Sequence, residues 1–406
     1  MVLIQPMASG VLAMLLAVGS GSVGAAPDVV PRVAQVAPNS VTGQLDETSD
    51  TLEDGSYYAV HTFEGTAGDI VAINLASEDF DAYLILVGPD GETVAENDDG
   101  EGTNSLLVVQ LPATGRYQVL ANTYEAGAVG AYSLGWRSAT AAEAAEAEVL
   151  QRAERLNQQA TELYEAGRYD EAEPFLQEAL QIRQTALGPD HPDVATSLNN
   201  LAELYRLQGR YGESEPLHQE ALSIRRQQLG DRHPAVATSL SNLALLHLDQ
   251  GRYEEAEPLH QESLAIRRER LGDRHPDIAT SLNNLAGLYQ LQGRYEEAEP
   301  LYQESLAIRR ERLGDRHLDV ATSLNNLAGL YKDQGRYEEA EPLYQESLAI
   351  RHERLGDRHP YVAASLNNLA ELYKDQGRYG EAEPLYQESL AISRERLGDR
   401  HPYVAA

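Results

Sequence analysis

The chain of 406 residues has no cysteine, one tryptophan and three phenylalanines. The lack of cysteine excludes disulfides, thiol catalysis, cysteine-ligated metals and lipidation after signal cleavage. Lysine is nearly absent, since Lys332 and Lys374 are the only two. Acidic residues outnumber basic ones by 64 to 32, which gives a formal net charge of -32. Because each phosphate contact needs a cation, this balance argues against nucleic acid and anionic lipid as partners.

Catalytic signatures are missing as well. The chain contains no GxSxG, HExxH or phosphate-loop motif. Serine, histidine and aspartate are frequent, but no spacing among them specifies a catalytic triad. We therefore expect a protein that is not an enzyme.

The N-terminus carries a short apolar run, Val11 to Val18, followed by small residues. The run is too short to span a bilayer, and Val23-Gly24-Ala25 suits cleavage after Ala25. No lysine or arginine precedes the run, although secretory signals usually have one. We expect residues 1–25 to be a signal peptide and residues 26–41 a linker. The mature chain would then be exported, periplasmic or extracellular, without membrane insertion.

Residues 42–137 show a period of two. Short β-rich segments are separated by Gly, Asn, Asp and Pro, with no helical pattern between them. This pattern predicts an all-β antiparallel sandwich. The segment GPDGE, residues 88–92, predicts a hairpin turn with Asp90 and Gly91 at its tip.

Two acidic segments of this region, SEDFDAY and ENDDG, place oxygen-bearing side chains in predicted turns. Such oxygens on loops suit calcium, but Asp and Asn are common in turns without a metal, and no EF-hand spacing is present. The candidate calcium ligands are Asp79, Asp81, Asn97, Asp98 and Asp99.

After the β-rich region the composition changes to alanine and glutamate. Thr140 and Glu143 have the spacing of a capping box, which predicts a helix that starts there and runs toward Ala166. We therefore expect residues 138–148 to be a helical linker.

Residues 149–406 repeat every 42 residues. The copies 275–316 and 317–358 differ at only five positions. A unit this short cannot bury its own apolar faces, so the copies must stack into an all-α solenoid. Six units and the start of a seventh are present. They begin at Val149, His191, His233, His275, His317, His359 and His401.

Each unit divides into two helices. In the unit that begins at His191, Pro192 suits the first helical position and Gly209 suits the end of the helix. A second helix is expected from Tyr211 to Leu229. The histidine that begins each unit is expected to be structural, because units stacked ~10 Å apart cannot share one metal.

Charges are ordered along each second helix. In one copy, Glu296, Glu297 and Glu299 lie in the first turns, and Arg309, Arg310 and Arg312 in the last. This order complements the helix dipole, and we expect these side chains on a solvated face.

The residues Leu198-x2-Leu201-Ala202-x2-Tyr205, followed by Gly209-x-Tyr211, resemble the tetratricopeptide signature. With HPDVATSLNNLAELY and GRYEEAEPLYQESLAIR, the 42-residue period resembles the kinesin-light-chain type of this repeat. No segment resembles the coiled coil that joins kinesin light chains to a motor, so a motor role is not implied.

The segments FDAYLILVGPDGETVAENDDG and GRYQVLANTYEAGAVGAYSLGW resemble the bacterial pre-peptidase C-terminal domain. The resemblance implies a small sandwich of exported bacterial proteins over residues 42–137. In that family the domain often accompanies a peptidase, whereas here it precedes a repeat array.

Asparagine is a poor helix former, yet each first helix carries it on the side opposite the apolar stripe. In the resembled family this side lines a concave groove, where asparagines bind the backbone of an extended peptide. A carboxamide can donate and accept at once, which suits a peptide N–H and C=O. The alternative is that these amides are merely solvated. The candidate groove residues are Asn199, Asn200, Asn242, Asn283, Asn284, Asn325, Asn326, Asn367, Asn368 and Arg206.

We expect an exported scaffold whose groove binds a peptide or protein segment. Two alternatives remain: the recognition part of a longer protein with a caspase-like peptidase domain, or an architectural spacer whose groove binds nothing. The last helix pattern carries Leu385, Leu390, Ile392 and Leu397, and no further helix pair follows to cover it. An uncovered apolar face of this kind predicts self-association.

Overall fold

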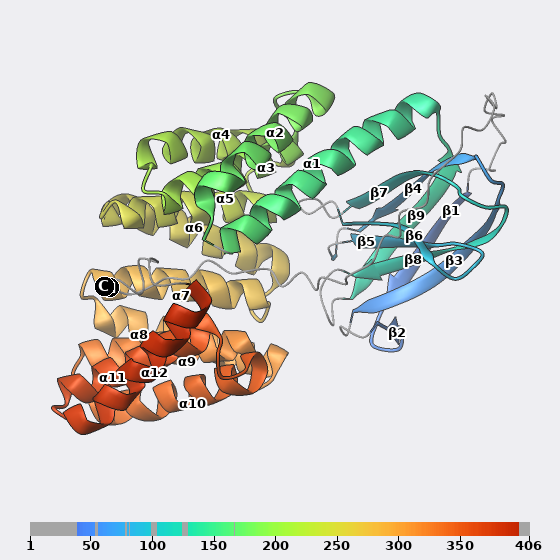
Figure 1. The fold of residues 1–406 in the computed structure, drawn as a ribbon. Coiled ribbons are helices and arrows are strands. Elements are labelled where there is room, and N and C mark those ends of the chain that lie inside the picture. Colours follow the sequence, from blue (N-terminus) through green and yellow to red (C-terminus); the bar gives the residue numbers. More distant parts are fainter. Residues whose placement is uncertain are drawn as a thin grey trace. The chain divides into compact units, whose positions relative to one another are not determined.

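The computed structural model describes residues 39–52, 56–77, 79–80, 82–98, 104–123, 129–165 and 167–397. The predicted signal peptide lies outside this range, as does most of the predicted linker. Within the described residues, nine strands precede twelve helices (Figure 1). The strands are β1 (Asn39–Leu45), β2 (Asp50–Thr51), β3 (Tyr57–Gly65), β4 (Ile70–Ala76), β5 (Ala82–Val87), β6 (Thr93–Asp98), β7 (Asn104–Gln110), β8 (Gly115–Thr123) and β9 (Gly130–Ser138).

The strands form two sheets. One has the order β1-β9-β4-β7 and the other the order β2-β3-β8-β5-β6. Every pairing is antiparallel, which confirms the predicted sandwich. The predicted hairpin turn joins β5 to β6, where Gly88 N donates to Glu92 O over 2.8 Å. Gly91 has a φ of 86° there, a left-handed conformation that favours glycine.

The sandwich core is apolar and rich in aromatic contacts. Leu84, Ile73 and Tyr117 are fully buried. Phe63 stacks on Tyr117 and on Trp136, with ring centroids 5.5 and 5.9 Å away. Alternate residues of each strand supply this core, as the period of two predicts.

Gly43 is required by a close cross-strand contact. It lies opposite Tyr132 on β9, and a Cβ at position 43 would overlap the Tyr132 ring. The Tyr132 hydroxyl lies 2.8 Å from His61 Nε2. We expect Gly43→Val to displace this ring and to destabilise the sandwich by about 2 kcal/mol.

Trp136, the only tryptophan, reports this unfolding by its fluorescence. Thr42→Val changes an exposed neighbour on β1 and serves as the control. Equal urea midpoints for the two variants would contradict the prediction.

The first helix begins as the capping box predicts. Thr140 N donates to Glu143 Oε2 over 2.7 Å, and Glu143 N donates to Thr140 Oγ1 over 3.2 Å. Hydrogen bonds from Arg137 and then from Thr140 lower the pKa of Glu143 to about 2. The helix, α1, spans Ala141–Glu165, close to the predicted range.

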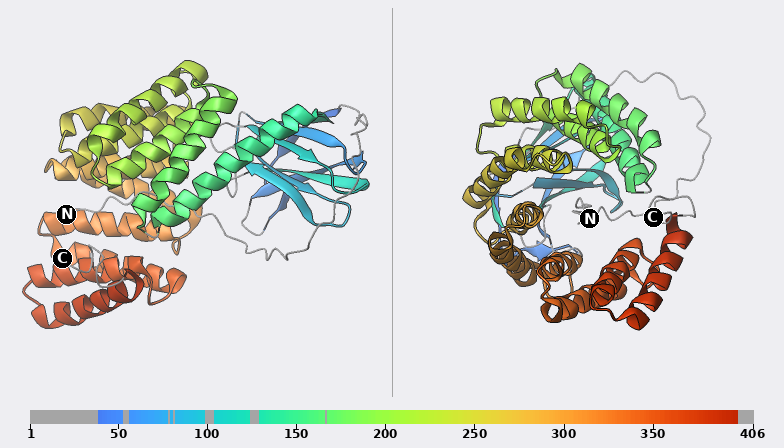
Figure 2. Two further views of the ribbon diagram at one scale, coloured as in Figure 1. Left: turned by 45° about the horizontal axis from the view of Figure 1, so that its top comes forward. Right: turned by 90° about the vertical axis from the view of Figure 1, so that its left-hand side faces the viewer.

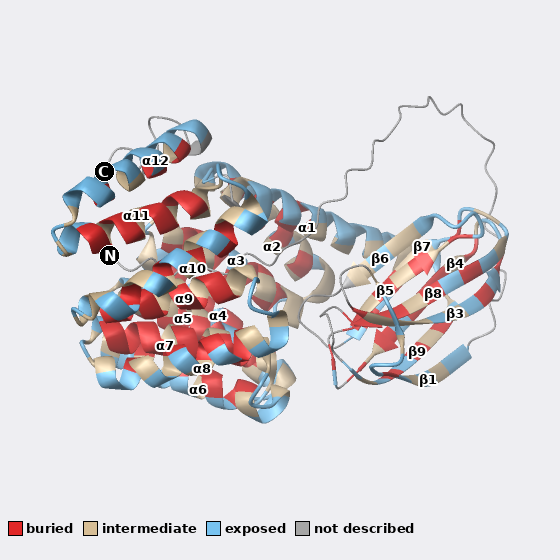
Figure 3. Ribbon diagram, turned by 90° about the horizontal axis from the view of Figure 1, so that it is seen from below, coloured by how far each residue is buried: buried red, intermediate tan, exposed pale blue. Residues whose placement is uncertain are grey.

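Eleven further helices follow within the described residues, and together with α1 they form helix pairs with a 42-residue period. They are α2 (Tyr169–Leu187), α3 (Pro192–Leu207), α4 (Tyr211–Leu229), α5 (Pro234–Asp249), α6 (Tyr253–Leu271), α7 (Pro276–Leu291), α8 (Tyr295–Leu313), α9 (Leu318–Asp333), α10 (Tyr337–Leu355), α11 (Pro360–Asp375) and α12 (Tyr379–Leu397). Along each helix a buried stripe alternates with exposed residues (Figure 3). No helix of the described residues is long and apolar enough to cross a membrane.

The histidine before each first helix is an N-cap. His191 Nδ1 accepts a hydrogen bond from Asp193 N over 3.2 Å, which satisfies one of the amides that a helix start leaves unpaired. The predicted structural role is thus confirmed. The same contact recurs at His233, His275, His317 and His359.

Two compact units are distinguished along the chain, and the boundary between them falls within α4, after Ile224. In the second unit the pairs α7–α8, α9–α10 and α11–α12 follow one another in chain order (Figure 2). At its end, Ile392 is 1% exposed and packs against α11, whereas Leu390 is exposed. The apolar face of α12 that is open to self-association is therefore smaller than the sequence indicates.

Candidate functional site

The structure exposes the two asparagines of each first helix unequally. Among the second asparagines of the pairs, Asn200 is exposed. The others are half-buried: Asn242, Asn284, Asn326 and Asn368. The first is buried in the earlier repeats. The exposed fraction is 4% for Asn199, 5% for Ser241, which replaces asparagine, and 8% for Asn283, while Asn325 and Asn367 are half-buried.

Asparagines of successive first helices bond to one another. Asn326 Nδ2 donates to Asn283 Oδ1 over 3.0 Å, and Asn368 Nδ2 donates to Asn325 Oδ1 over 2.8 Å. Each bond joins the second asparagine of one repeat to the first asparagine of the repeat before it. Part of the predicted groove therefore holds the repeats together, a role that the sequence analysis missed.

Asn199 and Arg206 are also satisfied internally, which corrects the expectation that this face is exposed. Asn199 Oδ1 lies 2.9 Å from His218 Nδ1 on α4. Arg206 is 8% exposed and forms two hydrogen bonds with Glu203, at 2.6 and 2.8 Å. The first asparagine therefore bonds to the second helix of its own repeat, and the arginine bonds to a glutamate of its own helix.

Four candidate carboxamides remain without a side-chain hydrogen bond to any described residue. Their amides are half-buried or exposed, so both the donor and the acceptor of each can reach a ligand. They are Asn200, Asn242, Asn284 and Asn367.

Polar residues near the C-terminal ends of the first helices are also paired. Gln290 is 4% exposed, accepts from the Tyr302 hydroxyl over 2.9 Å and donates to Asp333 Oδ2 over 2.7 Å. In the next repeat Lys332 replaces this glutamine, and its Nζ lies 3.2 Å from Glu371 Oε2. The charges at these positions are therefore partly neutralised within the array.

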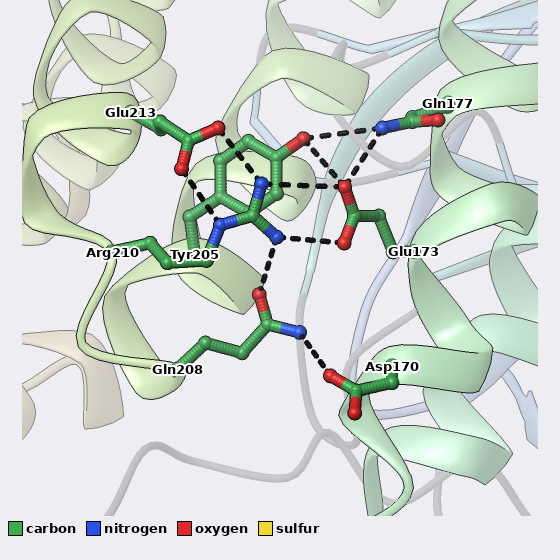
Figure 4. Close-up of polar contacts among 7 residues, drawn as sticks. All are labelled: Asp170, Glu173, Gln177, Tyr205, Gln208, Arg210 and Glu213. Carbon is green, nitrogen blue, oxygen red and sulfur yellow. Dashed lines mark hydrogen bonds and ion pairs between the residues drawn. The ribbon is translucent and has the colours of Figure 1, made fainter.

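A second polar cluster joins the repeat that begins at His191 to the repeat before it (Figure 4). Tyr205 donates its hydroxyl proton to Glu173 Oε1 over 3.0 Å, and the Arg210 guanidinium stacks on the Tyr205 ring at 3.9 Å. Arg210 also bonds to Glu173 and Glu213 at 2.7 and 2.8 Å. We call this cluster the tyrosine–arginine clamp. It recurs at Tyr289 with Arg294, at Tyr331 with Arg336 and at Tyr373 with Arg378.

One arginine of each second helix from α2 to α10 is buried rather than solvated, which corrects the prediction for Arg309. It is 3% exposed and donates to Ser323 Oγ over 2.9 Å and to Asp319 O over 3.2 Å on the next first helix. Burial lowers the pKa of Arg225, the equivalent residue, to about 9. The same arginine–serine bond recurs at Arg183, Arg225, Arg267 and Arg351.

The candidate calcium ligands are only partly described. Asp79 Oδ2 accepts from Ala131 N over 2.8 Å, and Asn97 Nδ2 donates to Leu106 O over 2.8 Å. Asp81, Asp99 and the side chain of Asp98 lie outside the described residues. Within the described part of the chain, no group of three or more His, Cys, Asp or Glu is placed to hold a metal. Calcium binding stays a prediction.

Two family profiles match the chain. The tetratricopeptide repeat profile matches overlapping segments that together cover residues 151–406. The chain belongs to the tetratricopeptide repeat family. The profile of the bacterial pre-peptidase C-terminal domain matches residues 42–123, within the sandwich. Tetratricopeptide arrays are typically non-catalytic scaffolds that offer extended binding surfaces.

Two solved structures are similar to half or more of the chain. BtubC (BKLC) from P. vanneervenii is 27% identical, with a TM-score of 0.45 over 62% of this chain and 94% of that one. A putative kinesin light chain with nearly identical repeats from Podosopora anserina is 30% identical, with a TM-score of 0.44 over 50% of this chain and 97% of that one. No curated protein matches the chain.

Proposed function

We propose that the repeats form an exported protein-interaction scaffold that holds an extended peptide along the asparagine-bearing face of the first helices. The observation that carries this proposal is the set of three free carboxamides within the unit 225–406, Asn242, Asn284 and Asn367. Asparagine disfavours a helix interior, and in these three positions no internal bond to a described residue offsets its cost.

Backbone recognition fits the chemistry of these side chains. A carboxamide can donate to a peptide C=O and accept from a peptide N–H, so it recognises an extended chain whatever its side chains are. The near-identity of the repeats suits such a ligand, because an extended backbone presents the same groups at regular intervals. Export, with a signal peptide at residues 1–25, is part of this proposal.

The test uses a fluorescent pool of randomised decapeptides and the triple variant Asn242→Ala, Asn284→Ala, Asn367→Ala. Each amide lost removes about 1 kcal/mol of hydrogen bonding, so the three together predict a loss of about 100-fold in affinity by fluorescence anisotropy. None of these side chains has an internal hydrogen bond, so helicity by circular dichroism should be kept or rise slightly.

The matched control changes three other amides in successive repeats: Gln219→Ala, Gln261→Ala, Gln303→Ala. These exposed glutamines of the second helices bond to glutamates one turn away, and Gln261 and Gln303 also donate to the clamp tyrosines Tyr289 and Tyr331, away from the proposed binding face. This variant should bind the pool like the parent chain. If the parent chain does not bind the pool, or if the asparagine variant binds it equally well, the array is a spacer and the proposal is wrong.

A further inference from the structure

Gly329 leaves an open position on the proposed binding face. It follows Asn325 by one helical turn on α9 and is half-buried. A Cβ at this position would meet only the Tyr344 hydroxyl at 3.5 Å and Gln290 Nε2 at 3.9 Å, which is ordinary contact. Packing therefore does not require glycine there, although glycine is among the least favourable residues in a helix interior.

The Tyr344 hydroxyl points toward this open position and has no partner. Tyr344 lies on α10 and is 3% exposed, yet its hydroxyl forms no hydrogen bond with any described residue. Its equivalent, Tyr302, donates to Gln290. The difference arises because Lys332 replaces that glutamine and turns toward Glu371 instead.

The surroundings of this hydroxyl are acidic. Burial and then the carboxylates of Asp333, Glu371 and Asp375 raise the pKa of Tyr344. The phenol therefore stays protonated and keeps an oxygen that can accept a hydrogen bond. Lys332, the cation at the position that Gln290 holds in the repeat before, is already paired with Glu371.

We propose that Gly329 and Tyr344 form a pocket for one basic side chain, lysine or arginine, of the peptide bound to this face. This inference rests on the proposed function. The aliphatic stem of the ligand residue passes over Gly329, where no side chain blocks it. Its N–H groups donate to the Tyr344 hydroxyl and to Asp333 or Asp375 at the C-terminal end of the two first helices. The net charge of -32 favours approach of a basic segment.

The experiment compares four pools of randomised decapeptides that differ only in the fixed central residue: arginine, lysine, norleucine or glutamate. Binding to the whole chain is measured by fluorescence anisotropy at low and at physiological salt. The arginine and lysine pools should bind about 10-fold more tightly than the norleucine pool, and the glutamate pool most weakly. The preference should shrink as salt screens the carboxylates.

Two variants test the pocket itself. Tyr344→Phe removes a hydroxyl with no internal bond, and Gly329→Leu fills the open position. Each should bring the arginine pool to within about twofold of the norleucine pool, and Tyr344→Phe should leave norleucine binding unchanged. Tyr302→Phe, whose hydroxyl is bound to Gln290, is the matched control and should keep the preference for basic residues.

The outcomes separate the two proposals. Equal binding of all four pools that is still lost on Asn242→Ala, Asn284→Ala, Asn367→Ala would overturn the basic pocket and leave the peptide scaffold standing. A basic preference that survives both Tyr344→Phe and Gly329→Leu would also overturn the pocket. No binding of any pool would overturn both proposals.

Discussion

Lowering the pH from 7 to 5 should destabilise the repeat array through one buried histidine, His260 on α6. It is 1% exposed, and neither ring nitrogen has a hydrogen-bond partner. Burial and then the charge of Arg267 lower its pKa to about 4. In the unfolded chain a histidine titrates near 6.5, so at pH 5 the unfolded state binds a proton that the folded state does not. Stability therefore falls as the pH drops through ~6.5 and levels off below ~4, with a loss of about 2 kcal/mol at pH 5.

The check is urea unfolding at pH 7 and pH 5, followed by circular dichroism. His260→Tyr introduces the residue that Tyr302 supplies at the equivalent position two helices later, so it should fit without strain. The variant should lose about 2 kcal/mol less than the parent chain between the two pH values. The same pH dependence in both proteins would show that His260 is not responsible.

Arg309→Ala should have the largest effect at neutral pH. The side chain of Arg309 joins two repeats, through Ser323 on α9 and Thr280 on α7. Alanine removes these bonds and leaves a cavity, which together predict a loss of about 3 kcal/mol. Because each repeat contacts only its neighbours, a weakened junction should also broaden the unfolding transition.

Two further variants show whether the loss comes from the buried position of Arg309 and from its charge. Arg312→Ala removes an exposed arginine of the same helix whose Nε donates to Arg274 O, and it should change stability by about 0.5 kcal/mol. Arg309→Met keeps most of the buried volume without a charge and should recover part of the lost stability. If Arg309→Ala and Arg312→Ala had equal midpoints, the buried arginine would not be a junction residue.

Local features of this fold were predictable from the sequence. The change of period from two to about 3.6 separates strands from helices, and the capping box at Thr140 and the proline after His191 mark helix starts. Each of these signals spans only a few residues. Their physical basis is local, so no knowledge of the stacking was needed.

Contacts between repeats were not predictable in the same way. Arg309 and Arg310 look alike in the sequence, and only the position of the next helix decides which one is buried. The bond between Asn326 and Asn283 spans 43 residues, so it depends on how neighbouring repeats stack. One signal was available: a serine follows each of the five buried arginines of the second helices by 14 residues.

The tyrosine–arginine clamp has a consequence for how the length of such an array can change. Its arginine always meets a glutamate 37 residues earlier, as Arg336 meets Glu299 and Arg294 meets Glu257. If residues 275–316 were removed, Arg336 would meet Glu257, a residue of the same type in the same place. Because contacts across each junction keep a constant offset, whole units can be inserted or deleted without separating clamp partners. The number of repeats, and with it the length of peptide that the scaffold can hold, can therefore vary by duplication while each junction stays the same.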